Sequence, residues 1–354
     1  MWTAIRLNKM RYITLYRKNN NGLRIAMIIL FALMVLCTFR PMDTIDTDNY
    51  YEYYLAANVT EPVPELSYVV VSIFWKNVIG GVLGFRCVML SYYILTFAIL
   101  YSLLRKASNP LMSLLIFFSF AFSLQICIQV RAPLANMILL SSIEDIEHRK
   151  IKSHYLKIFF ASVIHTSSIV FVVVYPALRF LEKYRSKAVM YGLPVFAAAA
   201  ARAAASSIEL IVNYGVRIGI SGLERFSIYF LPKYYAERIN PFNRISIILV
   251  LIYYSFLFFV GLKKMNTKEI TYLIIIAYSV FFYFVGYYSI ALIGYRFPES
   301  LNLILIFAIP ALFKHIARTR NNRMVCYTML FIYLILINNQ YETIPTILSC
   351  LRLA

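Results

Sequence analysis

The sequence predicts an all-α membrane protein with many spans, and three observations lead to that class. Of the 354 residues, 61% are hydrophobic and only 14% are charged, whereas soluble domains are close to half apolar and about one quarter charged. Several apolar runs approach the roughly 20 residues that a helix needs to cross a bilayer. Lys and Arg gather in short segments between these runs, as the positive-inside rule describes. Because no long polar segment could fold separately, we expect residues 1–354 to form a single multi-span membrane domain.

The net charge of +19 raises the alternative of a nucleic-acid-binding protein. The basic residues flank apolar runs, however, which favours membrane topology and contacts with lipid headgroups. We therefore expect the lipid bilayer, and no nucleic acid, as a partner. The five cysteines are scattered along the chain, which predicts small core residues without a disulfide framework. The sequence contains no P-loop, no Gly-rich dinucleotide turn and no HExxH, so nothing in it supports nucleotide or zinc chemistry.

The chain begins with a basic segment and an anchor that we expect to stay uncleaved. Residues 1–24 carry six basic residues and no acid, which predicts a cytoplasmic N-terminus. Residues 25–39 are predicted to form the first span, and Arg40-Pro41 follows where a signal peptide would have small residues. The loop 40–66 carries six of the sixteen acids, so it is predicted to be a main periplasmic segment.

The next elements alternate across the membrane. Residues 67–81 are short and mixed in polarity, which predicts an interfacial or partly inserted helix. Residues 85–104 are predicted to span inward and 110–130 to span outward, so that Arg131 emerges at the outer face. The helix predicted at 132–147 then returns to a basic turn.

A parity argument predicts a hairpin near His165. The segments 148–157 and 179–187 are both basic and are both expected in the cytoplasm. The apolar run between them must therefore cross twice or not at all, and two short helices that turn near His165 satisfy this condition. Non-helical backbone at such depth requires a protein or water lining. The other histidines lie in basic turns and are expected to be solvated: His148, His154 and His315.

The second half continues the alternation, to a total of about eleven crossings. The segment 204–243 is the second main periplasmic segment in this topology. No internal repeat is visible, which disfavours transporter folds built from duplicated halves. The remaining spans are predicted at 188–203, 244–262, 270–290, 299–314 and 324–338.

Several arginines are predicted to lie on the outer side, where they suit a phosphate ester. The planar guanidinium stays charged and pairs bidentately with oxygen atoms. Arginines around one low-dielectric cavity repel each other unless an anion binds there, and a clamped pyrophosphate is a better leaving group. The alternative for each is contact with headgroups or with a nearby acid. The candidates are Arg131, Arg202, Arg217, Arg225 and Arg296.

Other candidates supply sugar contacts and a base. Tyrosines such as Tyr50 and Tyr54, next to carboxylates, are typical of a sugar-binding surface or of an interfacial aromatic belt. A histidine has an ordinary pKa of about 6.5, so His165 could act as a general base or be a hydrogen-bonded packing residue. Asp43, Asp46 and Asp48 could hold a divalent cation, but no further ligand motif supports it, and we expect neither metal nor cofactor.

Three stretches together resemble the EpsG-like branch of the Wzy-type polysaccharide polymerases. Their order and spacing fit that family, and the resemblance covers residues 40–180 well and the remainder by architecture. Ala132 departs from the family pattern, which commonly has glutamine there. The stretches are Asp46-Thr-Asp48-Asn-Tyr50 with Tyr54 and Glu65 downstream, Arg131-Ala-Pro-Leu-Ala135, and His165-Thr-Ser167-Ser168.

The resemblance implies a membrane glycosyltransferase, of GT-C-like architecture and independent of metal, in the bacterial inner membrane. Such a polymerase joins oligosaccharide units carried on undecaprenyl pyrophosphate at the periplasmic face, beside a flippase and a chain-length regulator. The implied catalytic residues are His165, Asp46 and Asp48. The expected substrate-binding residues are Arg131, Tyr50, Tyr54 and Glu65 from these stretches, together with Arg217, Arg225 and Arg296 from the predicted topology.

Two other classes would also need arginines in a cavity. A lipid-linked oligosaccharide flippase is one alternative, although pseudo-repeats would then be expected. An O-antigen ligase is the other, since it uses the same type of donor with a different acceptor.

Overall fold

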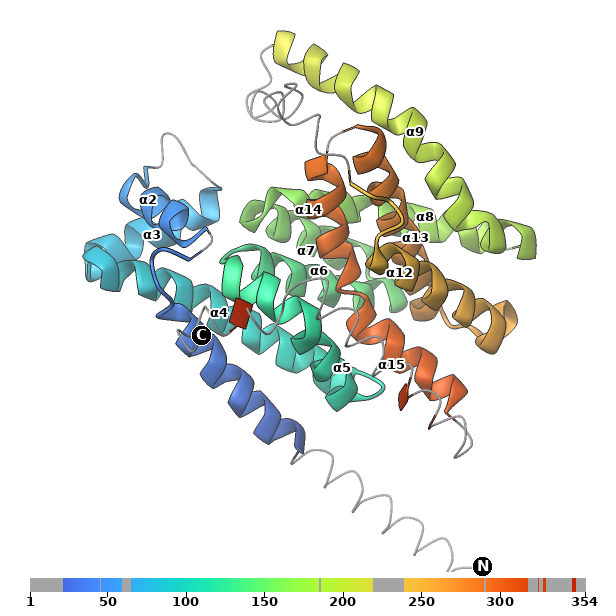
Figure 1. Cartoon of the computed structure of the whole chain (residues 1–354), viewed down its shortest axis with the longest axis horizontal. Coiled ribbons are helices and arrows are strands. Elements are labelled where there is room, and N and C mark those ends of the chain that lie inside the picture. The colour runs from blue at the N-terminus through green and yellow to red at the C-terminus, as the bar shows by residue number, and fades with distance from the viewer. Residues whose placement is uncertain are drawn as a thin grey trace, which may run out of the picture. The chain divides into compact units, whose positions relative to one another are not determined.

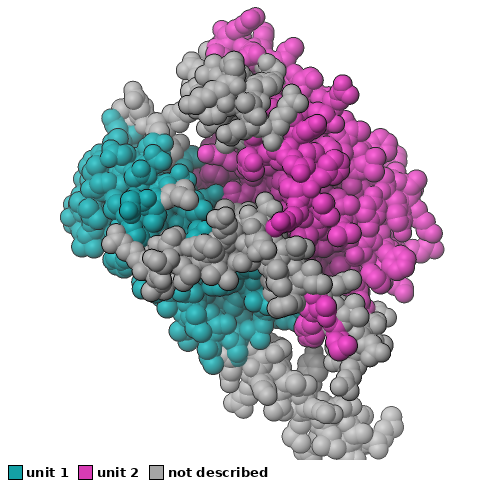
Figure 2. Space-filling model, in the orientation of Figure 1, with its two compact units in different colours: residues 1–137, 341–354 teal, residues 138–340 magenta. Residues whose placement is uncertain are grey.

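The computed structural model describes most of the chain as helix (Figure 1), and the all-α prediction is confirmed for the described residues. The described residues are 22–44, 46–58, 65–184, 186–218, 239–289, 291–317, 324, 327–328 and 346–347. The chain divides into two compact units: unit 1, residues 1–137 with 341–354, and unit 2, residues 138–340 (Figure 2). The expectation that residues 1–354 form one membrane domain stays a prediction. The predictions for residues 1–21, for 219–238 and for most of the last span lie outside the described residues.

Unit 1 contains the elements that carry two of the three motifs. Asn109 starts α5, because its side chain accepts a hydrogen bond from the Met112 amide, and Pro110 suits the first helical turn. The helices are Gly22–Thr38, α2 (Thr47–Leu55), α3 (Leu66–Val78), α4 (Gly81–Lys106) and α5 (Pro110–Ile116), followed by π-helical turns at Phe117–Ala121 and Ser123–Ile128 and by the first residues of α6 (Ala132–Glu147).

Unit 2 is built around α13 (Thr267–Tyr288), most of which is buried. This helix begins with a capping box in which Asn266 and Glu269 each bind the other's backbone amide. Helices α8, α9, α12 and α14 pack against it. The other elements are α7 (Ile151–Ile164), η3 (Thr166–Val173), α8 (Val174–Lys183), α9 (Lys187–Arg217), α12 (Arg244–Ser255), η5 (Phe256–Val260), η6 (Leu262–Lys264), α14 (Ala291–Asn302) and α15 (Leu305–Ile316).

Three described helices are long and apolar enough to cross a membrane: α4, α9 and α13. A fourth span is possible if Ile293–Asn302 and Leu305–Ile316, which are bent by 47°, form one broken crossing. Shorter apolar helices also occur, including the helix Gly22–Thr38 and the run Arg244–Val260. These features support a membrane protein, whereas the total of about eleven crossings stays a prediction.

The helix α9 extends farther than the sequence predicted. The predicted span ended at residue 203, but the helix continues without a break to Arg217 and takes in the first part of the expected outer segment. Alanine has the highest helix propensity, and the Ala-rich run extends helix formation past Arg202. The helix also contains Pro194.

The turn predicted near His165 is present. Helix α7 ends at Ile164, His165 has extended backbone (φ −150°, ψ 111°), and η3 packs back against α7. The other histidines were predicted to be solvated. This is confirmed for His148, which is exposed, and is wrong for His154, which is fully buried. His315 has a protein partner, because its Nε2 lies 2.7 Å from the Glu269 carboxylate.

Two thiols that the sequence separates by 90 positions lie together in unit 1. The Cys37 and Cys127 sulfurs are 3.7 Å apart and both side chains are buried. Cysteine spacing alone gave no sign of this contact, because the helix Gly22–Thr38 and the π-helical turn meet only in the tertiary structure.

A close approach of α13 and α14 predicts a stability effect at Gly286. A Cβ added there would lie 2.5 Å from the Gly294 Cα and 2.8 Å from its nitrogen. Because both obstacles are backbone, we expect Gly286→Ala to destabilise the chain by about 1–3 kcal/mol, seen as a lower Tm of the purified protein. Gly192→Ala is the control, since its Cβ would meet only ordinary contacts near Phe196. An equal Tm for the two variants would contradict the close packing.

Candidate functional site

The centre of the candidate site in unit 1 is the buried side chain of Arg131, which is 8% exposed. Its Nη1 forms an ion pair with the Glu65 carboxylate. Its guanidinium carbon lies 5.4 Å from the centre of the Tyr50 ring and 5.7 Å from that of Tyr68. Cations are attracted to aromatic faces. We call Arg131, Glu65, Tyr50 and Tyr68 the arginine–tyrosine cluster.

Local structure brings the four residues of the cluster together. Glu65 is the N-cap residue of α3, and Tyr50 lies on the buried face of α2. The Tyr68 hydroxyl on α3 donates a 2.6 Å hydrogen bond to the Tyr50 carbonyl, which fixes α2 against α3. Arg131 immediately precedes α6. Three segments that are distant in sequence therefore meet at one guanidinium.

Tyr54 lies one helical turn after Tyr50, on the same buried face of α2. Its side chain is fully buried and its ring contacts those of Tyr51 and Phe85. A Cβ at position 84 would collide with the Tyr54 hydroxyl, so Gly84 makes room for it. Burial raises the pKa of the Tyr54 phenol, with a smaller contribution from Tyr51. The phenol is therefore neutral near pH 7, and its predicted contact with substrate stays a prediction.

Arg40 links the start of α2 to the segment that leads to Arg131. The side chain is 1% exposed, and its Nε donates to the Thr47 hydroxyl at 2.7 Å. The guanidinium also donates to the carbonyls of Ile126, Cys127 and Ile128. These carbonyls end a helical run, where backbone acceptors lack partners and a cation is favoured.

Two further contacts hold the segment before Arg131. The Tyr93 hydroxyl lies 2.7 Å from the Ile126 carbonyl and 3.3 Å from that of Gln129, and donates its one proton to them. The Asn136 amide on α6 donates to the Gln125 side-chain oxygen at 2.8 Å. The backbone on both sides of Arg131 is thus fixed by buried polar groups, so its guanidinium is preorganised.

Three arginines described in unit 1 are buried. Arg86, which is 9% exposed, donates to the Thr38 carbonyl at 2.9 Å and lies close enough to Arg40 for their charges to repel. Arg40, Arg86 and Arg131 are all buried, whereas no Asp or Glu is among the buried polar side chains described in this unit. The half-buried Glu65 is the carboxylate that pairs with one of them. A buried guanidinium is stabilised by anionic or hydrogen-bonding partners, so the surroundings of Arg131 suit an anion.

The two aspartates of the first motif lie at the exposed start of α2. Asp46 is the N-cap residue with left-handed backbone (φ 64°), and its side chain makes no capping hydrogen bond. Asp48 accepts a hydrogen bond from the Asn49 amide at 2.8 Å. Their helix also carries Tyr50, but neither carboxylate is part of the arginine–tyrosine cluster. In the described part of the chain, no three His, Cys, Asp or Glu side chains gather closely enough to hold a metal ion.

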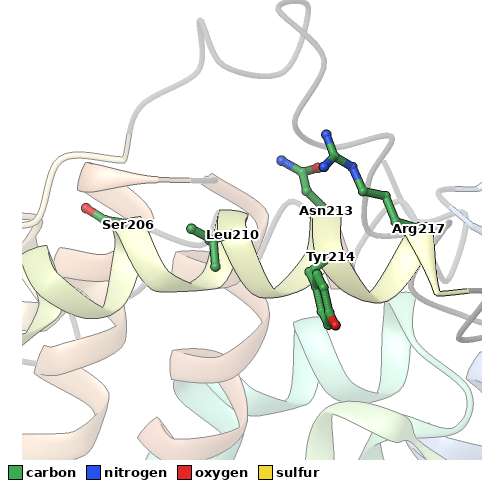
Figure 3. Close-up of a pocket in the computed structure, with 5 residues that line it drawn as sticks. All are labelled: Ser206, Leu210, Asn213, Tyr214 and Arg217. Carbon is green, nitrogen blue, oxygen red and sulfur yellow. The ribbon is translucent and has the colours of Figure 1, made fainter.

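The other predicted site residues belong to unit 2. His165 is half-buried at the break between α7 and η3, and Arg296 is exposed on α14. Arg217 is exposed at the end of α9, where it lines an open groove of about 450 Å³. In Figure 3, Asn213 and Arg217 lie on one side of the helix and Tyr214 points to the other. Arg202 is exposed on the same helix, and Arg225 lies outside the described residues.

The sequence interpretation missed Arg40, Arg86, Tyr68 and Tyr93 as parts of the site. Arg40 was interpreted as a residue that flanks the first predicted span, 25–39. Arg86, at the start of the predicted span 85–104, was overlooked. A usable signal existed for both, because an ionisable residue beside or within a membrane-like run is costly to bury and is often functional. The tyrosines carried no comparable signal, since tyrosine is common in this chain.

Comparison with known proteins agrees with the motifs that contribute to this site. The sequence matches the EpsG family over residues 23–346, which include most of unit 1, all of unit 2 and every predicted site residue. No curated protein and no solved structure was found to be similar. The match extends over most of the chain, and the chain therefore belongs to the EpsG family, a family of polysaccharide polymerase-like membrane proteins.

Proposed function

We propose that this protein is a polysaccharide repeat-unit polymerase of the Wzy type. It transfers a glycan from undecaprenyl pyrophosphate to a sugar hydroxyl of another lipid-linked repeat unit, at the periplasmic face of the bacterial inner membrane. A flippase supplies the lipid-linked units, and a chain-length regulator is a further partner. Membership of the EpsG family and the apolar helices support the coarser class, a polymerase-like membrane protein.

The observation that carries the proposal is the buried guanidinium of Arg131 at the centre of the arginine–tyrosine cluster. Arg131 is held by cation–π and ion-pair contacts while its Nε has no hydrogen-bond partner among the described residues. An arginine has five N–H donors in a planar fork that matches phosphate oxygens. The Arg131 guanidinium therefore has unused capacity for an anion such as a pyrophosphate ester.

The proposed reaction is one displacement at the anomeric carbon. A base takes the proton of the acceptor hydroxyl, whose oxygen bonds to the anomeric carbon as the bond to the pyrophosphate oxygen breaks. The electron pair leaves with undecaprenyl pyrophosphate, and Arg131 stabilises the developing charge. His165, Asp46 and Asp48 are the candidate bases.

The same proposal assigns binding roles to the remaining residues. Arg217, Arg225 and Arg296 are further contacts for the phosphates. Tyr50 and Tyr54 contribute to substrate binding around Arg131, and Glu65 acts on binding there through its ion pair with this arginine.

The direct test is polymerisation of a defined undecaprenyl-pyrophosphate-linked repeat by the purified protein in nanodiscs. A ladder of lipid-linked oligomers is expected, and NMR of the product should show the opposite anomeric sense to the donor linkage. Retention would reject the single displacement. His165→Ala should lower kcat, and a fully active His165→Ala variant would remove histidine from the mechanism.

A deletion strain distinguishes the polymerase from the two other classes. Loss of a polymerase leaves single capped units on the cell surface, loss of a ligase leaves none attached, and loss of a flippase blocks export. Single capped units are the expected phenotype, and either of the other two would overturn the proposal.

A further inference from the structure

Glu65 occupies one side of the guanidinium that the proposed reaction needs for its donor. The carboxylate pairs with Arg131 Nη1, and both side chains are largely withdrawn from solvent, at 14% and 9% exposure. Screening by water is weak at such a site, so a second anion arriving at Arg131 meets both the guanidinium and the competing carboxylate. The ion pair therefore affects the affinity of Arg131 for an anionic ligand.

We propose that Glu65 is an exchangeable counter-anion, which occupies Arg131 in the empty protein, yields to the pyrophosphate of the donor, and returns to help release the product. This inference deepens the proposed function and rests on it for the identity of the anion. In the empty protein, Glu65 keeps the buried guanidinium compensated, because an unpaired buried charge is strongly destabilising.

The chemistry of the reaction explains why such a counter-anion is useful. In the donor, each phosphate carries one ionisable oxygen, because the terminal phosphate is also esterified to the sugar. When the bond to the anomeric carbon breaks, the terminal phosphate gains a further ionisable oxygen, whose pKa is near 6 in phosphate esters. The product therefore carries more negative charge than the donor and binds a guanidinium more tightly. A carboxylate that recaptures Arg131 opposes this product inhibition.

The surroundings of the ion pair favour exchange over permanent pairing. The aromatic rings of Tyr50 and Tyr68 hold the guanidinium independently of Glu65. Glu65 itself is the N-cap residue of α3, with extended backbone (φ −142°, ψ 156°), and its side chain makes no capping hydrogen bond. The start of α3 therefore gains no capping hydrogen bond from this carboxylate.

Binding of inorganic pyrophosphate to the full chain in nanodiscs, followed by calorimetry, tests the proposal. Glu65→Gln removes the competing charge and is expected to lower the Kd about tenfold. Glu65→Asp keeps the charge and should stay nearer the wild-type Kd. The matched control is Glu52→Gln, which makes the same change at an exposed position on α2. An unchanged or raised Kd for Glu65→Gln would overturn the proposal and make Glu65 a residue that merely orients Arg131.

A second measurement uses the wild-type chain and does not depend on the folding of any variant. Pyrophosphate should displace Glu65 from Arg131 and so accelerate its modification by a water-soluble carbodiimide, measured by mass spectrometry. Glu52 is the internal reference, since it is exposed with or without the ligand. An unchanged or slower modification of Glu65 would reject exchange.

These measurements need no polymerisation, so the counter-anion role of Glu65 and the polymerase activity can be refuted independently. A chain that shows the affinity shift but makes no polymer would refute the polymerase and leave the counter-anion standing. A chain that polymerises normally but shows no affinity shift would refute the counter-anion and leave the polymerase standing.

Discussion

Replacing Arg131 with alanine is expected to lower kcat/KM for polymerisation about 100- to 1,000-fold, the usual effect of removing one preorganised charge-stabilising group. Arg131 is the arginine of the arginine–tyrosine cluster. It pairs with Glu65, and its Nε has no hydrogen-bond partner among the described residues. The measurement is the rate of oligomer formation from a defined lipid-linked repeat by the purified protein. Arg131→Lys keeps the charge but loses the planar fork, so an intermediate rate is expected.

A control is needed because Arg131→Ala leaves the Glu65 carboxylate without its partner. An unpaired buried charge destabilises the fold by itself. The double variant Arg131→Ala/Glu65→Gln removes both charges and is expected to restore the Tm without restoring polymerisation. Recovery of activity in the double variant, or full activity in Arg131→Ala, would show that Arg131 does not act on the substrate.

Replacing Arg40 with methionine is expected to destabilise the chain by about 2–5 kcal/mol, because each buried acceptor left without a partner costs about 1–3 kcal/mol. The carbonyls of Cys127 and Ile128 would lose the donors of the Arg40 guanidinium, and the Thr47 hydroxyl would lose the hydrogen bond from the Arg40 Nε. The measurement is the Tm of the purified protein in detergent, followed by intrinsic fluorescence.

Arg105→Met provides the matched control for Arg40→Met. Arg105 lies in the same unit but is exposed in the last turn of α4, where it contacts the Tyr101 ring. An exposed residue away from buried networks usually changes stability by less than about 0.5 kcal/mol. If Arg40→Met and Arg105→Met have the same Tm, the hydrogen bonds of Arg40 do not hold the segment before Arg131.

Much of the helical framework could be predicted because apolar runs and helix signals are local. The predicted helix at 132–147 coincides with α6, and the span at 85–104 lies within α4. The extent of α9 was underestimated because the predicted span ended just after Arg202, although one arginine does not end an Ala-rich helix. The burial of His154 was missed for a similar reason: its neighbours in sequence are basic, but its neighbours in space are the backbone of Ser142 and aromatic rings.

The candidate site could be predicted only in part. The motifs pointed to Arg131, Tyr50 and Glu65 as binding residues, and unit 1 brings these three together. The sequence could not indicate that Glu65 pairs with Arg131, since they are 66 positions apart. Nor could it indicate that Arg40 caps the helical run before Arg131, because a cap of this kind depends on where two distant segments meet.

The order of amino acids is enough to assign this chain to its class: a helical membrane protein of the EpsG family, with an arginine motif that opens a helix. Hydrophobicity, helix propensity and charge placement act over neighbouring residues, so they can be recognised without the fold. Which charges are buried, and what compensates them, became known from the folded chain. Burial and pairing arise from residues that are far apart in sequence, and the free energy of a buried charge depends on its partners in space.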